Sequence, residues 1–132
     1  MSAVADAKRL VVKVGTSTLT YENGRLNLRR IESLVKVLSD LKNAGREIVL
    51  VTSGAIGVGA GHLGLKERPR DIGGKQAAAA VGQCELMYTY DKQFSEYGHV
   101  TAQVLLTRDV VEDDRRKSNV GNTLCRLLEY GA

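Results

Sequence analysis

Apolar residues along the chain alternate between patterns typical of buried strands and of amphipathic helices. Two short runs rich in Val, Leu and Ile occupy residues 9–14 and 47–52, and glycine follows each within two residues. Such continuous runs are typical of strands buried in a parallel sheet. Between them, apolar residues recur every three or four positions over 27–44, which predicts a helix that buries one face. Asn27 can cap its first turn, and Gly45 can end it.

Polar and glycine-rich segments separate these elements. Residues 15–25 are rich in Gly, Thr and Asn and predict a turn without a helix, in which Asn23 and Gly24 form the tip. Residues 53–64 are rich in glycine and follow a predicted strand directly, so we expect a turn that continues into a helical segment. Residues 66–74 contain the only proline of the chain and predict a loop.

The second half of the chain continues the alternation. Residues 75–97 have helix-forming composition without proline, so they predict a long helix that ends at Gly98. The partly alternating run 99–107 predicts a third strand, nearer the edge of the sheet than the first two.

The carboxyl-terminal segment is charged and then amphipathic. Residues 109–117 predict a charged loop or short helix, and a last helix is expected to open at Ser118 or Asn119 and to stop before Gly131. The order strand, helix, strand, helix, strand, helix predicts an α/β fold, a three-layer α/β/α sandwich with a mainly parallel sheet. Since a last helix normally returns the chain to another strand, we expect a partial fold from a longer chain.

Composition narrows the class of protein. Of 132 residues, 43% are apolar and 26% are charged, which is typical of globular chains and argues against disorder. The net charge of +4 suits an anionic ligand and does not require nucleic acid. The absence of an apolar leader or membrane-length run predicts a cytoplasmic protein without a membrane segment. Cys84 and Cys125 have no metal-ligand spacing, so we expect them to be reduced and structural.

The first candidate site follows the first predicted strand. Lys13 lies near the carboxyl end of that strand, and ligands of open parallel sheets bind beyond such ends. Its ammonium can neutralise phosphate oxygens, while the N–H groups of Gly15 and Thr16 can donate to them. The alternative is a strand-end lysine that extends into solvent before an ordinary turn.

The second candidate site follows the second predicted strand. Ser53, Gly54 and Ala55 lead into the glycine-rich segment, and a helix that begins there would direct free N–H groups at a carboxylate or phosphate. The alternative is that Ser53 is a plain N-cap and that the glycines allow a helix to pack closely on the sheet.

Other motifs give no functional prediction. Residues 59–64 fit GxGxxG but begin too far beyond the strand for a dinucleotide site, and Lys75 lacks the rest of a P-loop. The basic cluster 115–117 follows three acidic residues without interleaved aromatic residues, so it predicts a solvated surface. His62 and His99 have no ligand spacing, which favours loop or surface roles, and no metal site is predicted.

The two candidate sites together resemble one known family. VVKVGTSTLT at 11–20 and IVLVTSGAIGVGAGHLG at 48–64 are similar to the glutamate 5-kinase branch of the amino acid kinase family. The similarity continues through KQAAAAVGQ at 75–83 and through residues 102–131. It therefore covers nearly the whole chain from residue 9.

This resemblance implies a phosphoryl transfer. Members of the branch use ATP and Mg²⁺, the ion being held mainly by the nucleotide phosphates, to phosphorylate the γ-carboxylate of glutamate in the first step of proline synthesis. By position, Lys13 would contact the ATP phosphates and stabilise the transferring phosphoryl group, with Gly15 and Thr16 in the same turn. Ser53 would bind glutamate, helped by the residues that follow it, Gly54 and Ala55.

The resemblance also sets the expected domain organisation. Residues 9–132 would be the amino-terminal, acceptor-binding part of an amino acid kinase domain, after a flexible segment 1–8. The family's glutamate-holding Asn-Glu-Asn-Asp segment and its nucleotide-binding half are not among these residues, so we expect the chain by itself to be inactive. Feedback inhibition by proline and a homo-oligomer of the full-length enzyme are also implied.

Three alternatives stay open at this point. The chain can be a non-catalytic folded fragment or interaction module, which the missing half favours. It can instead belong to another amino acid kinase, such as N-acetylglutamate kinase, which shares the lysine-glycine and double-glycine features. A basic nucleic-acid binder is favoured only by the net charge.

Overall fold

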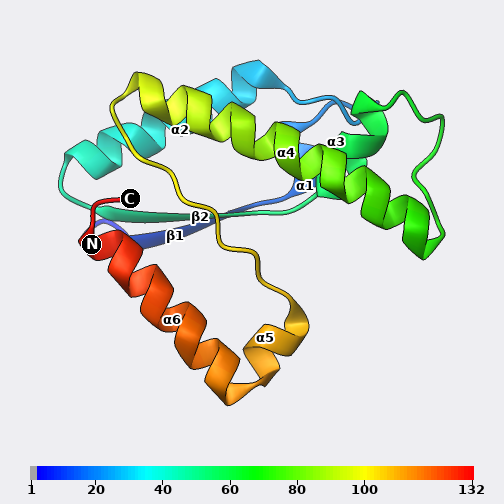
Figure 1. The fold of residues 1–132 in the computed structure, drawn as a ribbon. Coiled ribbons are helices and arrows are strands. Elements are labelled where there is room, and N and C mark those ends of the chain that lie inside the picture. The colour runs from blue at the N-terminus through cyan, green and yellow to red at the C-terminus, as the bar shows by residue number, and fades with distance from the viewer. Residues whose placement is uncertain (1–2) are drawn as a thin grey trace.

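The computed structural model describes residues 3–132 as two parallel strands with helices on both sides. In chain order the elements are β1 (Arg9–Val14), α1 (Thr16–Leu19), α2 (Leu28–Asn43), β2 (Glu47–Thr52), α3 (Ala55–His62), α4 (Ile72–Glu96), α5 (Arg108–Glu112) and α6 (Asp114–Glu129). Figure 1 shows α2 and α4 on one side of the strands and α5 and α6 on the other. The predicted α/β class with a parallel sheet is confirmed.

The two strands form one parallel ladder whose register runs from Arg9 opposite Glu47 to Val14 opposite Thr52. At its amino-terminal end, Nε of Arg9 donates to Oε2 of Glu47 over 2.6 Å. Because the strands are parallel and in register, they end at the same edge of the sheet. Figure 1 shows α1 and α3 at this edge.

The core lies between the strands and the α2–α4 side. On β1 the alternate residues turn inward, and Val14 is buried whereas Val11 is 65% exposed. Ile31 and Val35 are fully buried on α2, which confirms the predicted helical face. These residues belong to one core cluster, whose other buried members come from four segments and are Leu19, Leu26, Val58, Leu86 and Tyr90.

The predicted third strand over residues 99–107 is wrong. Within residues 3–132 the sheet has only β1 and β2, and residues 99–106 carry no strand hydrogen bonds. Val100 and Leu105 are about two-thirds exposed, at 70% and 68%. A strand needs a neighbour that satisfies its backbone N–H and C=O groups, and this segment forms no ladder with either strand.

Three helices also differ from the prediction: α1 was not expected, and two others begin earlier than expected. The turn over 15–25 contains the one-turn helix α1, although its tip at Gly24 has the expected positive φ of 82°. Helix α4 begins at Ile72 rather than Lys75, because the Asp71 carboxylate accepts from the N–H of Gly74 over 2.8 Å.

Helix α6 begins earlier than predicted for the same reason. The Asp113 side chain accepts from the N–H of Arg116 over 2.9 Å, so the helix opens at Asp114 instead of Ser118 or Asn119. In both α4 and α6 an aspartate caps the helix within a segment whose charge or glycine content favours a loop. The short helix α5 agrees with the expected loop or short helix there.

Other expected helix ends are confirmed. The Asn27 side chain accepts from the N–H of Arg30 at the start of α2. Gly45 and Gly98 have positive φ of 91° and 77° just beyond α2 and α4, the left-handed conformation that glycine adopts without strain.

The structure also bears on the predictions for the two cysteines, a membrane span and the segment 1–8. Cys84 and Cys125 lie on α4 and α6, carry free thiols and are exposed, and their structural role stays a prediction. Among the described residues no helix has an apolar stretch long enough to cross a bilayer. The predicted flexible segment 1–8 includes residues 1 and 2, which lie outside the described residues.

Candidate functional site

The structure brings the two candidate segments to one edge of the sheet. Lys13 lies opposite Val51 in the ladder, one residue before the end of β1, and Ser53 directly follows the end of β2. Both residues are exposed. The expectation that they lie at the carboxyl ends of adjacent parallel strands is therefore confirmed, while their roles in binding stay predictions.

The turn after β1 leaves room beside its backbone. Gly15 has an extended conformation, with φ −77° and ψ 159°, and precedes α1. A Cβ built on it would meet nothing within 4 Å among the described atoms. At the end of α1, the hydroxyl of the C-cap residue Thr20 donates to the carbonyl oxygen of Thr16 over 2.8 Å. Open space beside fixed N–H groups is what an incoming anion requires.

The turn after β2 touches the turn after β1. Gly54 adopts the left-handed conformation, with φ 97° and ψ 19°. A Cβ at this position would overlap the side chain of Thr16. Glycine is therefore required both by the backbone conformation and by the contact between the two turns. This contact joins the two predicted site segments into one surface.

Helix α3 presents its amino-terminal end at this surface. Its N-cap is Gly54, and no side chain among the described residues caps it, so the alternative role of Ser53 as a plain N-cap is wrong. The N–H of Val58 donates to Gly54 over 3.1 Å, which leaves the N–H groups of the first turn without helical acceptors. These groups and the helix dipole favour a negative charge there.

The glycines of α3 permit close packing, but on different partners from those predicted. A Cβ at Gly59 would overlap the backbone of Ala78 on α4, and one at Gly82 on α4 would overlap the backbone of Ala55. A Cβ at Gly61 would overlap the turn at residues 23–25. Helix α3 therefore lies in backbone contact with α4 and with the turn, rather than on the sheet alone.

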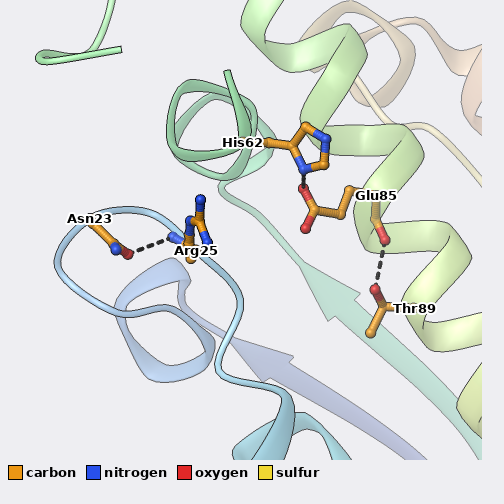
Figure 2. A network of polar contacts seen from close by, with 5 residues as sticks. All are labelled: Asn23, Arg25, His62, Glu85 and Thr89. Carbon is orange, nitrogen blue, oxygen red and sulfur yellow. Dashed lines mark hydrogen bonds and ion pairs between the residues drawn. The ribbon is translucent and has the colours of Figure 1, made fainter. Parts of the chain in front are cut away.

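A polar contact also links α3 to α4. Nδ1 of His62 lies 2.8 Å from Oε2 of Glu85, and Figure 2 shows this contact beside the Thr89 hydroxyl, which donates to the carbonyl oxygen of Glu85. The sequence analysis assigned His62 a surface or loop role and did not identify Glu85. No local pattern joins residues so far apart along the chain, so only the packing of α3 on α4 reveals the pair.

The Tyr90 side chain packs in the core next to Thr52 at the end of β2. Its side chain belongs to the core cluster, is only 3% exposed and stacks with Phe94 at a ring-centroid distance of 6.4 Å. Burial raises the pKa of the Tyr90 phenol, and the Thr52 hydroxyl partly opposes this shift. Tyr90 therefore stays neutral near neutral pH and acts as a packing residue under the site.

A shallow hollow lies next to the end of β1. Its volume is about 400 Å³, and Val14, Leu19 and Leu34 contribute apolar lining. Arg29 and Arg30 lie at the same hollow, and a guanidinium nitrogen of Arg30 donates to the carbonyl oxygen of Thr18 over 3.2 Å. This bond ties α2 to α1. Among the described residues no group of three His, Cys, Asp or Glu side chains is placed to hold a metal ion.

Comparison with known proteins identifies the family of this chain. The model of the amino acid kinase family matches residues 8–132. The chain belongs to the amino acid kinase family. The resemblance seen in the sequence is thus confirmed over nearly all of the chain.

Curated relatives are similar over the same length. The chain is 64% identical over 129 residues to a protein of Clostridium perfringens named glutamate 5-kinase, covering 98% of this chain and 48% of the relative. It is 59% identical to the glutamate 5-kinase of Moorella thermoacetica and 58% identical to that of Listeria innocua, covering 34% and 47% of these relatives. This amino acid kinase chain therefore spans from about a third to a half of the length of these relatives.

Proposed function

We propose that the whole protein is a glutamate 5-kinase. It would transfer the γ-phosphoryl group of ATP to the γ-carboxylate of glutamate, giving γ-glutamyl phosphate and ADP, as the first step of proline biosynthesis. The proposal is supported by the identity of 58–64% to relatives that bear this name, over 98% of the chain.

The single observation that carries the site assignment is the contact between Gly54 and Thr16. It puts the Lys13–Thr16 segment and the Ser53–Ala55 segment on one surface, so that a donor and an acceptor anion can meet there. In this proposal the Lys13 ammonium neutralises ATP phosphate oxygens, and Gly15 and Thr16 line the same turn. A Cβ built on Gly15 would meet nothing within 4 Å, so an anion can approach the backbone of this turn.

The acceptor would lie at the end of α3. The Ser53 hydroxyl can donate to a glutamate carboxylate, and the N–H groups after Gly54 add a favourable dipole. An ionised carboxylate attacks phosphorus without losing a proton, so no general base is needed and none is proposed. Catalysis then depends on positioning the two anions and neutralising their charge.

The remaining parts of the proposal extend beyond this chain. ATP would carry Mg²⁺ mainly on its own phosphates. We further propose that residues 9–132 form the acceptor-binding part of the kinase domain. Cytoplasmic location, a homo-oligomeric full-length enzyme and inhibition by proline complete the proposal.

The test is glutamate-dependent ADP release by the whole protein, with hydroxylamine present to trap the acyl phosphate as a hydroxamate. We expect both products with glutamate and neither with N-acetylglutamate. Turnover of N-acetylglutamate alone would instead favour another amino acid kinase. The 132-residue chain by itself should release no ADP, and turnover by it near that of the whole protein would overturn its assignment as the acceptor-binding part.

A further inference from the structure

Helix α3 has little intrinsic tendency to be helical. Three of its eight residues, Gly57, Gly59 and Gly61, are glycine, which is the least favourable residue for a helix interior after proline. At Gly59 and Gly61, α4 and the 23–25 turn approach the backbone too closely for a Cβ, whereas a Cβ at Gly57 would meet the side chain of Arg68. The orientation of α3 must therefore be fixed by contacts with its neighbours rather than by its own sequence.

The His62–Glu85 contact is the polar link between these two helices. The Glu85 Oε2 atom is buried and accepts no hydrogen bond among the described residues, and Nδ1 of His62 lies 2.8 Å from it as an ion-pair partner. A carboxylate cannot donate a proton to Nδ1, so the contact is favourable when the imidazole carries a proton on Nδ1. Without His62, this buried carboxylate oxygen would lose its ion-pair partner.

The His62–Glu85 pair lies at the end of α3 that is away from the proposed glutamate site. His62 lies in the last turn of α3, where the helix dipole favours a proton donor. Ala55 begins the same helix at the proposed glutamate site, about 10 Å away at 1.5 Å per residue. Figure 2 shows the His62 side chain directed from α3 toward Glu85 on α4.

We propose that His62 and Glu85 are positioning residues for the acceptor carboxylate. By holding the carboxyl-terminal end of α3 against α4, they fix the direction in which its first-turn N–H groups point. Neither residue touches the reacting atoms. The inference rests on the proposed function, because it concerns how glutamate is oriented at the end of α3.

The experiment measures steady-state kinetics of the whole protein with glutamate and ATP varied in turn. His62→Ala should raise KM for glutamate about three- to fivefold, the range expected for losing a partly exposed ion pair, with kcat and KM for ATP nearly unchanged. His62→Asn should restore KM to within about twofold, because its amide nitrogen can take the place of Nδ1 as a donor. Arg126→Ala removes the exposed Arg126–Glu129 pair on α6 and serves as the matched control without effect.

A double-mutant cycle distinguishes the effect of the His62–Glu85 interaction from the effect of losing each side chain alone. His62→Ala combined with Glu85→Ala should raise KM for glutamate less than the product of the two single effects, because the double variant no longer buries an unpaired carboxylate. Amide hydrogen exchange should be faster at residues 55–58 in His62→Ala than in the unchanged protein. This second readout does not depend on activity.

The possible failures are distinguishable. If the unchanged protein turns over glutamate but His62→Ala has a normal KM for glutamate, the positioning role is wrong and the proposed function stands. Equal effects of His62→Ala and His62→Asn would likewise overturn it, since a donor group at this position would then be irrelevant. If the unchanged protein has no glutamate-dependent turnover, the proposed function fails, and the inference fails with it.

Discussion

The two sides of the sheet contain similar amphipathic helices that pack very differently. Helix α2 buries Ile31, Val35 and Leu38 against the strands and α4. Helix α6 has an apolar stripe of similar spacing, but the structure records no buried residue on it, and Leu124 is only half-buried. The comparison shows that a period of 3.6 predicts a helix and its face, whereas burial requires a second apolar surface of matching shape.

The polar contacts differ between the two sides in the same way. The His62–Glu85 contact on the α3–α4 side includes a buried carboxylate oxygen. On the other side, Arg116 pairs with Asp109 over 2.7 Å and both side chains are mostly exposed. Exposed pairs contribute little to stability because water screens them. The α2–α4 side should therefore dominate stability and function, and the following predictions test this.

The largest expected effect is a loss of stability from the packed side. Ile31→Ala should lower the free energy of unfolding by about 2–5 kcal/mol, because it removes buried methylene groups and leaves a cavity. Leu124→Ala on α6 is the matched control and should cost about 1 kcal/mol or less, since its side chain is already partly in water. Urea unfolding followed by circular dichroism measures both. Equal losses would show that the two sides are packed alike.

The next effect concerns catalysis at the end of β1. Lys13→Ala in the whole protein should lower kcat about 100- to 1,000-fold, as is typical when one preorganised charge that stabilises the transition state is lost. Lys13→Arg should not restore it, because a planar guanidinium cannot replace a point charge beside the Gly15 turn. Lys117→Ala, on α6, is the control and should leave kcat unchanged. A normal kcat in Lys13→Ala would remove this lysine from the reaction.

Loss of the Ser53 hydroxyl should have a smaller and different effect. Ser53→Ala should raise KM for glutamate by an amount equivalent to about 1.5–3 kcal/mol, the value of a hydrogen bond to a charged group, with KM for ATP nearly unchanged. Ser118→Ala on α6 provides the control. If Ser53→Ala raises KM for ATP instead of glutamate, the two candidate segments have been assigned to the wrong substrates.

The smallest effect lies on the α5–α6 side and depends on pH. The Thr107 hydroxyl, with help from Arg116, holds the pKa of Asp109 below its usual value. A carboxyl group whose pKa is lower in the folded state stabilises that state above its unfolded pKa of 3.8, and this contribution is lost as pH falls through the folded pKa. Between pH 7 and pH 3, the thermal unfolding temperature Tm should therefore fall slightly less for Asp109→Asn than for the unchanged protein. A larger fall in the variant would reverse the sign of this linkage.

Much of the fold and the site could be predicted from local sequence. Continuous apolar runs gave β1 and β2, the apolar spacing and Asn27 gave α2, and Gly45 and Gly98 marked helix ends. The site segments followed from strands that end in glycine turns. The starts of α4 and α6 were missed because Asp71 and Asp113 act as caps only once the following residues turn into a helix. The strand predicted over 99–107 failed because a strand depends on a partner that local sequence does not specify.

The sequence by itself determined the identity of the two strands, the helical face of α2 and the glycines that end α2 and α4. Backbone conformation and apolar periodicity are local properties, so they can be predicted from neighbouring residues. The family resemblance was also visible there, through Lys13 and Ser53 with their glycines. Only the tertiary structure decided that Gly54 meets Thr16, that Gly59 and Gly82 lie at the α3–α4 contact and that His62 pairs with Glu85. These contacts join residues far apart in the chain, and which of them form depends on how whole helices pack on one another.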